Sequence, residues 1–453
     1  MLGRMPRRHS GLSCGKGARA PRGARSALPL CALLAGACAT SAANNEHGPT
    51  FGDDAGDGAP SDAPPGTGDA GAAPDGEALD STSPGDGAPL GDGPSGANDA
   101  STADASDGGC TSTLALVAVG ASNVARARFA AGQWSLATVT SQGGAAPPAL
   151  PGLIAFGGGY LAALVASGAG ASLESSAYTG SWSALARVGA LTARGTPALA
   201  VVGAAAHVVY WGGDGLYYHG SYGGAWDAAS DRLEVDGGAQ SFGSSPPAAA
   251  AVGASLVVVQ SGSNGVVYDQ TWTGGAWQAA SAHPGTSVVP QLSPAVVALS
   301  GGPADLMVVY VRAGDANDYH LDFTTRTAGA WSAPAEVFDM PPGNVAYTGF
   351  TPSLAALPNG GAIVVWLGGS PASPYTSRYT PGAGWSAPAE ITALTLASPP
   401  VVAPGVCGAA AVAAMVEVSG QVDVATLTAS SWSQPLEIAG ATGMQSVALA
   451  AAP

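Results

Sequence analysis

A tryptophan and a carboxylate stand five residues apart in the segment AGAWSAPAEV, where Trp331 and Glu336 flank Pro334. An indole ring beside a carboxylate can bind a ligand, because the ring offers an apolar face and the carboxylate accepts hydrogen bonds. The same spacing after a tryptophan recurs at Glu390 and Glu437. The recurrence raises the question of whether the segment is a site or one unit of a larger pattern.

The sequence holds no set of residues with the spacing of a catalytic centre or a metal site. It has no Gly-x-Ser-x-Gly segment to expose a nucleophilic serine, and no His/Cys pair with the spacing of zinc ligands. The glycine-rich GGDGLYYHG leads into a strand-like segment, so it does not predict a phosphate loop. We expect no cofactor and no metal, and the sequence favours a protein that is not an enzyme. The histidines after residue 38 occur singly, at His47, His207, His219, His283 and His320.

The charges divide the chain into three parts. Residues 1–38 carry seven of the fifteen Lys and Arg and no acid, whereas residues 39–110 carry fourteen Asp and Glu and no Lys or Arg. Residues 111–453 carry seventeen acids and eight arginines. Nucleic-acid binding depends on clustered Lys and Arg that neutralise phosphates. We therefore do not expect nucleic acid as a partner.

Residues 1–38 have the pattern of an export signal. Their basic residues precede the apolar segment SALPLCALLAGAC, which is too short to span a bilayer permanently. The end of this segment, LLAGAC, resembles a bacterial lipobox, although Ala35 replaces the larger aliphatic residue usual there, and the resemblance implies a lipid on Cys38. Ordinary signal cleavage and a misassigned start are the alternatives. We expect a protein outside the cytoplasm, a lipoprotein of the outer membrane or cell surface, or else a secreted protein.

Residues 39–110 consist of Asp, Gly, Ala, Pro, Ser and Thr with almost no large apolar side chains. Such a segment cannot bury enough surface to offset the entropy of ordering it, and its like charges extend it. A calcium site at GDDAGDG is the alternative, but the carboxylates there follow no regular spacing. The composition predicts a disordered acidic linker.

A segment of the form Gly-x-Trp, or a close variant of it, recurs through residues 111–453. Its tryptophans follow one another at 48, 44, 51, 54, 54 and 47 residues, a period typical of propellers and solenoids. Each interval between tryptophans holds four short strand-like stretches separated by Gly, Asn, Asp and Pro. The tryptophans are Trp134, Trp182, Trp226, Trp277, Trp331, Trp385 and Trp432.

Four short strands per repeat predict an all-β fold, a seven-bladed β-propeller that occupies residues 111–453. An apolar run such as AIVVWL predicts the second strand, which neighbouring blades cover on both faces. The WSAP segments predict the outer edge strand, where a proline costs no ladder hydrogen bond. In this interpretation Trp331 packs between two blades.

The two ends of the chain predict how the ring closes. The first repeat starts at TLALVAVG without an inner strand, and MQSVALAAAP at the C-terminus is an inner strand without a blade. We therefore expect the C-terminal strand to pair with residues 113–120. Cys110 and Cys407 lie near this place, and we expect a disulfide between them, with two free thiols as the alternative.

The third strand of four repeats carries two aromatic residues at spacing four, which places both on one face of the strand. Arg128 and Arg378 precede an aromatic at equivalent places of two repeats. Packing between blades accounts for such aromatics without a ligand, and it is the favoured interpretation of the tryptophans. The aromatic pairs are Tyr218/Tyr222, Tyr268/Trp272, Tyr319/Phe323 and Tyr375/Tyr379.

Residues 111–453 resemble two families of secreted propellers, the sialidase-like propellers and the fucose-binding lectins. The lectins bind sugars in shallow sites between blades, where an aromatic ring stacks on the sugar and Arg and Glu bind its hydroxyls. Because Arg and Glu recur in only a few repeats here, the sequence excludes seven equal sites. The resemblance implies ligand-binding roles for Arg128, Arg378, Tyr218, Tyr268, Tyr319, Tyr379, Glu336 and Glu390.

The resemblance to sialidases is weaker, because the repeats lack the aspartate of the Asp box and the arginines do not recur at one blade position. The expected function is that of a monomeric, lipid-anchored binding module for a glycan or a cell-surface polymer. A protein-interaction scaffold of the cell envelope and a degenerate sialidase-like glycoside hydrolase are the alternatives.

Overall fold

The computed structural model describes eight segments of the chain, which all belong to one compact unit, Glu77–Pro453. The predicted signal, the linker, Cys38 and Cys110 lie outside the described residues. Within them, the secondary structure is almost entirely β, with one 3-10 turn at Pro358–Gly360. No helix among them is long and apolar enough to cross a membrane. The segments are residues 111–140, 151–166, 171–227, 231–232, 245–313, 319–337, 351–369 and 372–452.

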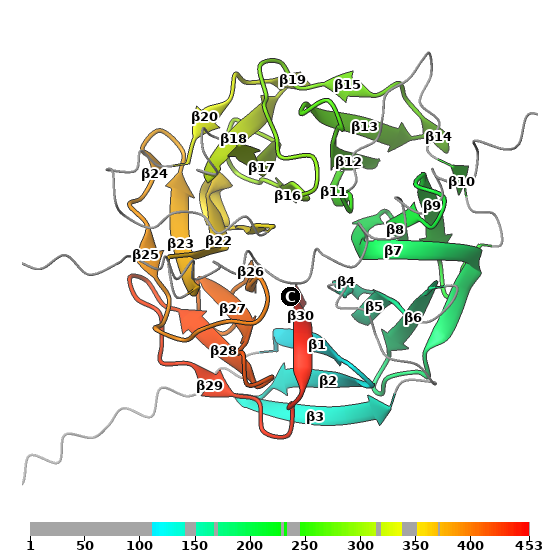
Figure 1. Cartoon of the computed structure of the whole chain (residues 1–453), viewed down its shortest axis with the longest axis vertical. Helices are drawn as coiled ribbons and strands as arrows, with labels where there is room; N and C mark the ends of the chain where they lie inside the picture. The colour runs from blue at the N-terminus through cyan, green and yellow to red at the C-terminus, as the bar shows by residue number, and fades with distance from the viewer. Residues whose placement is uncertain are drawn as a thin grey trace, which may run out of the picture. The chain divides into compact units, whose positions relative to one another are not determined.

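The described strands form antiparallel sheets arranged around a central axis, the architecture of a β-propeller (Figure 1). The sheet that contains the first and last described strands has the order β3 (Gln133–Thr140), β2 (Asn123–Ala130), β1 (Thr113–Gly120) and β30 (Met444–Ala452). The next has the order β10 (Asp231–Arg232), β9 (Tyr217–Tyr222), β8 (Ala205–Gly212), β7 (Ala186–Val202), β6 (Ser172–Tyr178), β5 (Gly159–Val165) and β4 (Gly152–Phe156).

The four remaining sheets repeat one pattern, in which three strands follow each other from the centre outward and short strands form the outer edge. They are β11 (Ala248–Val252), β12 (Ser255–Ser261), β13 (Val267–Thr273), β14 (Ala276–Trp277) and β15 (Ser281–Ala282); β16 (Ala295–Ala298), β17 (Leu306–Ala313), β18 (Tyr319–Thr327), β19 (Ala330–Trp331) and β20 (Ala335–Glu336); β21 (Ser353–Ala356), β22 (Ala362–Gly368), β23 (Ser373–Thr380), β24 (Gly384–Trp385) and β25 (Ala389–Glu390); and β26 (Val401–Pro404), β27 (Ala411–Val416), β28 (Val422–Leu427) and β29 (Leu436–Glu437).

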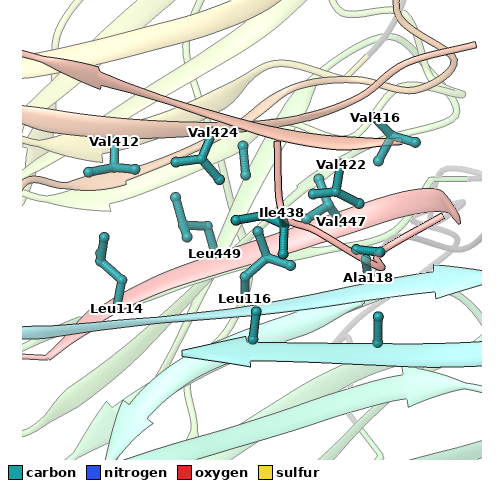
Figure 2. Packing of buried hydrophobic residues seen from close by; sticks show 14 of the residues in the cluster. Leu114, Leu116, Ala118, Val412, Val416, Val422, Val424, Ile438, Val447 and Leu449 are labelled. Atoms are coloured by element: carbon teal, nitrogen blue, oxygen red, sulfur yellow. The ribbon is translucent and has the colours of Figure 1, made fainter. Parts of the chain in front are cut away.

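The apolar runs of the sequence are the second strands, and they are buried on both faces as predicted. Every residue of β22 and β27 is buried. In the cluster of Figure 2, Leu116 of β1 and Leu449 of β30 pack against Val412 of β27 and Val424 of β28. Burying a side chain of this size contributes about 1.5–3 kcal/mol, so these contacts between sheets are a main source of stability.

The outer strands are interrupted after the tryptophan, and a serine fills the interruption. Between β19 and β20, the backbone N–H of Ser332 donates to the carbonyl of Thr325, and the Ser332 hydroxyl accepts from the Thr325 N–H at 3.0 Å. Ser183, Ser386 and Ser433 accept in the same way. The serine of the WS motif therefore replaces lost ladder bonds, which explains why a proline is tolerated two residues later.

One strand differs from the sequence prediction. The segments expected as the outer strand of one repeat and the inner strand of the next form a single strand, β7, which pairs with β6 on one side and β8 on the other. The partner changes from β6 at Thr192 to β8 at Ala193, and the register with β8 shifts between Arg194 and Ala198.

The first and last strands pair, in agreement with the sequence prediction. β1 and β30 are antiparallel, from Thr113 opposite Ala452 to Gly120 opposite Met444. Cys407 is disulfide-bonded, and its Sγ lies 3.9 Å from the carbonyl oxygen of Ser112. The pairing of Cys407 with Cys110 stays a prediction.

Candidate functional site

In five repeats, one residue of the third strand contacts the tryptophan of the next repeat. We call it the crevice residue, and it lies three places before the residue that pairs with the tryptophan of its own outer strand. For example, the indole N–H of Trp226 donates to the Ser175 hydroxyl at 2.7 Å, and Phe323 packs edge-on against Trp385. From the pairing registers, the crevice residues are Arg126, Ser175, His219, Asp269, Phe323, Thr376 and Val424. These seven side chains all differ chemically, whereas all seven repeats keep the tryptophan.

The crevice between β13 and β18 holds a cavity of about 430 Å³. Its crevice residue is Asp269, and Trp331 and Arg326 of the following sheet line the cavity from the opposite side. Asp269 is the only acid among the seven crevice residues. The other lining residues are Val252, Ser255, Val257, Thr271, Gln278, Ala279, Ser281 and Gly329.

Asp269 is held in place by two donors on one of its oxygens. Its Oδ1 accepts the indole N–H of Trp331 at 3.0 Å, and Nε2 of His283 lies 3.2 Å from the same oxygen. The residue is 7% exposed, and Oδ2 accepts no hydrogen bond from the residues that the structure describes. One carboxylate oxygen therefore fixes the side chain, and the other is left to accept a hydrogen bond from a ligand.

Trp331 is fixed by its neighbours. His283 stacks on it with ring centroids 3.9 Å apart, which covers one face of the indole. The guanidinium of Arg326 lies 5.9 Å from the indole centroid and is oriented by a two-pronged ion pair with Asp305, at 3.0 and 3.1 Å. The cavity thus joins a preorganised carboxylate, an indole and an arginine, a combination that can bind a compact ligand with hydroxyl groups.

The structure does not bring the eight sequence-predicted ligand residues together. Arg128 lies in the β2/β6 crevice, where its NH1 donates to the Tyr178 hydroxyl at 3.3 Å. Arg378 lies in the β23/β28 crevice and donates to the carbonyl of Ala429 at 2.9 Å. Both precede the residue that pairs with the tryptophan, so their equivalence in register agrees with the sequence. Their ligand-binding roles stay predictions.

The predicted tyrosines bond to turns or pack between sheets. The hydroxyl of Tyr218 donates to Asp214 at 2.5 Å, and the hydroxyl of Tyr268 accepts from Asn264 at 2.8 Å. Because Asp214 and Asn264 also accept from backbone N–H groups in these turns, both tyrosines stabilise the hairpins that precede them. Their ligand-binding roles, too, stay predictions.

Tyr379 and Tyr319 occupy different registers. Tyr379 packs against Phe323 and Trp385 in the β18/β23 crevice, with centroid separations of 5.8 and 5.4 Å. Tyr319 pairs with Ala313 at the start of β18, so the Tyr319/Phe323 pair lies on the opposite face from the other three pairs. The sequence spacing did not reveal this offset.

The two predicted glutamates lie on the outer edge. Glu336 lies 2.8 Å from Nδ1 of His320 and 3.8 Å from NH2 of Arg312, whereas Glu390 is exposed opposite Tyr375. Neither lines the cavity.

The β9/β13 crevice contains two buried histidines. Nδ1 of His207 and Nε2 of His219 lie 2.8 Å apart, both residues are 3% exposed, and both rings pack on Trp272. Burial, and to a smaller extent the neighbouring His207, lower the pKa of His219 to about 4. Burial also lowers the pKa of His207. The pair is therefore neutral at physiological pH.

The sequence analysis missed Asp269 and Arg326. Asp269 stands eight residues before Trp277, and Arg326 stands five residues before Trp331. Sequence spacing did not reveal that the two positions recur in other repeats, because the hairpins between the third and outer strands differ in length. The residue that pairs with the tryptophan stands four places before it at Tyr222 and six places before it at Tyr379. Within the described residues, no group of three or more His, Cys, Asp or Glu is placed to hold a metal ion.

No protein-family model matches the chain, and no curated protein matches it in sequence. Among solved structures, the BP39L lectin of Burkholderia pseudomallei is similar with a TM-score of 0.57 and 13% identity, over 73% of this chain and 96% of that chain. The lectin of Aleuria aurantia, described as a six-bladed β-propeller with a novel mode of fucose recognition, gives a TM-score of 0.45 and 15% identity, over 65% and 97% of the two chains. The second similarity is too weak to carry an argument. The chain thus has the β-propeller architecture that its sheets define, and this fold is similar to that of a bacterial lectin.

Proposed function

We propose that the chain is a glycan-binding module and that the β13/β18 crevice is a binding site. The observation that carries the proposal is the oxygen Oδ2 of Asp269, which is left for a ligand in a cavity shared with Trp331 and Arg326. A sugar matches these groups, because its hydroxyls donate to a carboxylate and accept from a guanidinium while its C–H faces pack on an indole.

The cavity volume and the fold support this assignment. A volume of about 430 Å³ lies within the range of small-molecule sites and accommodates one or two sugar rings. The similar fold of the Burkholderia protein, which is described as a lectin, is consistent with sugar binding on this architecture.

We further propose that the described strands make a seven-bladed ring that the β1–β30 pairing closes. Seven third strands with equivalent crevice residues, each strand paired with one of the seven tryptophans, support this count. A disulfide between Cys110 and Cys407 would fasten the entry of the chain beside the last inner strand.

For the location of the module, we propose export by residues 1–38, a lipid on Cys38 and an acidic tether over residues 39–110. This arrangement presents the propeller at the outer membrane or cell surface, within reach of glycans and surface polymers. The charge pattern and the lipobox-like LLAGAC support the proposal.

The test is a glycan array screened with the full chain, followed by calorimetry with the best-binding glycan. We expect Asp269→Asn to weaken that binding roughly 10- to 100-fold, because a hydrogen bond to a charged acceptor is worth about 1.5–3 kcal/mol. The control is Asp423→Asn, which changes an aspartate of similar burial that lies outside the cavity. No binding to any glycan at high protein concentration would overturn the proposed function, and equal losses in both variants would move the site elsewhere.

A further inference from the structure

The β2/β6 crevice carries two arginines on one face of β2. Arg126 is the crevice residue, and Arg128 lies two places further along the same strand. Arg126 is 1% exposed, and its guanidinium lies 5.4 Å from the ring centroid of Trp182. Arg128 is half-buried, and its guanidinium lies 5.3 Å from the ring centroid of Tyr178.

Three of the six nitrogens of these two guanidinium groups are buried without a hydrogen-bond partner among the described residues. Arg126 uses NH1 to donate to the carbonyl of Ser183 at 3.1 Å, but its Nε and NH2 are buried without a hydrogen bond. Nε of Arg128 is buried and unpartnered as well. No carboxylate of the described residues lies within ion-pair distance of either side chain.

Two other half-buried arginines have acids beside them, whereas the half-buried Arg378 donates to the carbonyl of Ala429. Nε of Arg312 pairs with Asp322 at 2.8 Å, and Arg326 forms its two-pronged pair with Asp305. A buried guanidinium keeps its charge and loses its hydration, and without an anion this is costly. Contact with the Trp182 ring offsets only part of that cost. Within the described part of the chain, the β2/β6 crevice therefore has two guanidinium groups and no carboxylate that pairs with them.

We propose that the β2/β6 crevice binds an oxyanion, the carboxylate or sulfate group of an acidic ligand such as a uronic or sulfated sugar. Nε and NH2 of Arg126 form one edge of the guanidinium and donate in parallel to two oxygens of such a group. Arg128 supplies a second positive charge from the half-exposed side. Because Nε and NH2 of Arg126 are buried, the half-exposed Trp182 moves aside when the oxyanion enters. The site is separate from the β13/β18 crevice and does not depend on the function proposed there.

The test measures the thermal midpoint of the full chain in sodium sulfate, sodium glucuronate and the neutral methyl glucoside, with sodium chloride to equalise ionic strength. When the anion concentration is about ten times its dissociation constant, binding is expected to raise the thermal midpoint by roughly 2–5 °C. Sulfate also stabilises proteins by exclusion from their surface, so the quantity compared is the difference between wild type and variant. Arg126→Met and Arg128→Met are expected to lose the increase. The control Arg194→Met, which removes an exposed arginine that also lies over a tryptophan ring, is expected to keep it.

A second readout separates binding from a structural role. Without anion, Arg126→Met is expected to be at least as stable as wild type, since it replaces an unpaired buried charge by an apolar chain of similar length. An increase with glucuronate alone identifies a carboxylated ligand, and an increase with sulfate alone identifies a sulfated one. If neither salt raises the thermal midpoint of wild type more than it raises the midpoints of the two variants, the proposal is wrong. If Arg126→Met does not fold, the half-exposed Arg128→Met gives the same comparison.

Discussion

Removal of residues 444–453 is expected to abolish the cooperative unfolding transition of the chain. The deletion removes β30, whose Met444, Val447 and Leu449 are at most 9% exposed and belong to the core cluster of Figure 2. It also leaves one edge of β1 without its ladder. Three large side chains contribute about 1.5–3 kcal/mol each, which together approaches the 5–15 kcal/mol that stabilises a typical domain.

Circular dichroism and calorimetry would measure this result, and adding a peptide of residues 444–453 is expected to restore part of the transition. Two point variants calibrate the deletion. Leu449→Ala is expected to cost about 2–4 kcal/mol, whereas Leu436→Ala, at an outer-edge leucine that is 58% exposed, is expected to cost less than about 0.5 kcal/mol. A truncated chain that unfolds cooperatively within about 1 kcal/mol of wild type would show that the first sheet does not depend on its inner strand.

Acid is expected to destabilise the fold through the histidine pair of the β9/β13 crevice. The pKa of His219 is about 4 in the fold and 6.5 in the unfolded chain, so the unfolded chain binds a proton first as the pH falls. The free energy of unfolding therefore decreases between pH 6.5 and pH 4, by about 3 kcal/mol in total for this one group. Above pH 6.5 the contribution of neutral His219 to the free energy of unfolding is fully present.

The double variant His207→Ile/His219→Phe isolates this effect. Ile363 and Phe323 occupy the equivalent places in other sheets, so both replacements fit the crevice of a related repeat. Urea unfolding at pH 7 and pH 4.5 is expected to show a smaller loss of stability in the variant than in wild type. The comparison of two proteins is needed because burial and the nearby Glu417 raise the pKa of Asp423 to about 6, which gives a stability change of opposite sign in the same range. Equal pH dependence of the two proteins would assign the acid sensitivity to other groups.

Much of the fold follows from the sequence, because burial on both faces leaves a continuous apolar run that no other element of this length produces. AIVVWL became β22, and MQSVALAAAP became the partner of β1. The continuous β7 was not predictable, since whether a chain turns or continues between two sheets depends on the register of its partners.

The candidate site was less accessible to sequence reasoning. A recurring tyrosine draws attention, but Tyr218 and Tyr268 stabilise hairpins, whereas Asp269 occurs once and has no repeat to mark it. The register that makes Asp269 equivalent to Arg126 depends on hairpin length, which only the paired strands define.

The unlike crevice residues have a consequence for avidity. A lectin with identical sites gains affinity by engaging several copies of one sugar, because the second contact occurs at a high effective concentration. Here Asp269, Arg126 and Val424 occupy one equivalent position, so a cluster of identical sugars meets different chemistry at each crevice. One molecule can then use several crevices at once only on a polymer whose chemical groups vary along its length. On a surface that carries a single kind of sugar, multivalent binding requires several copies of the chain.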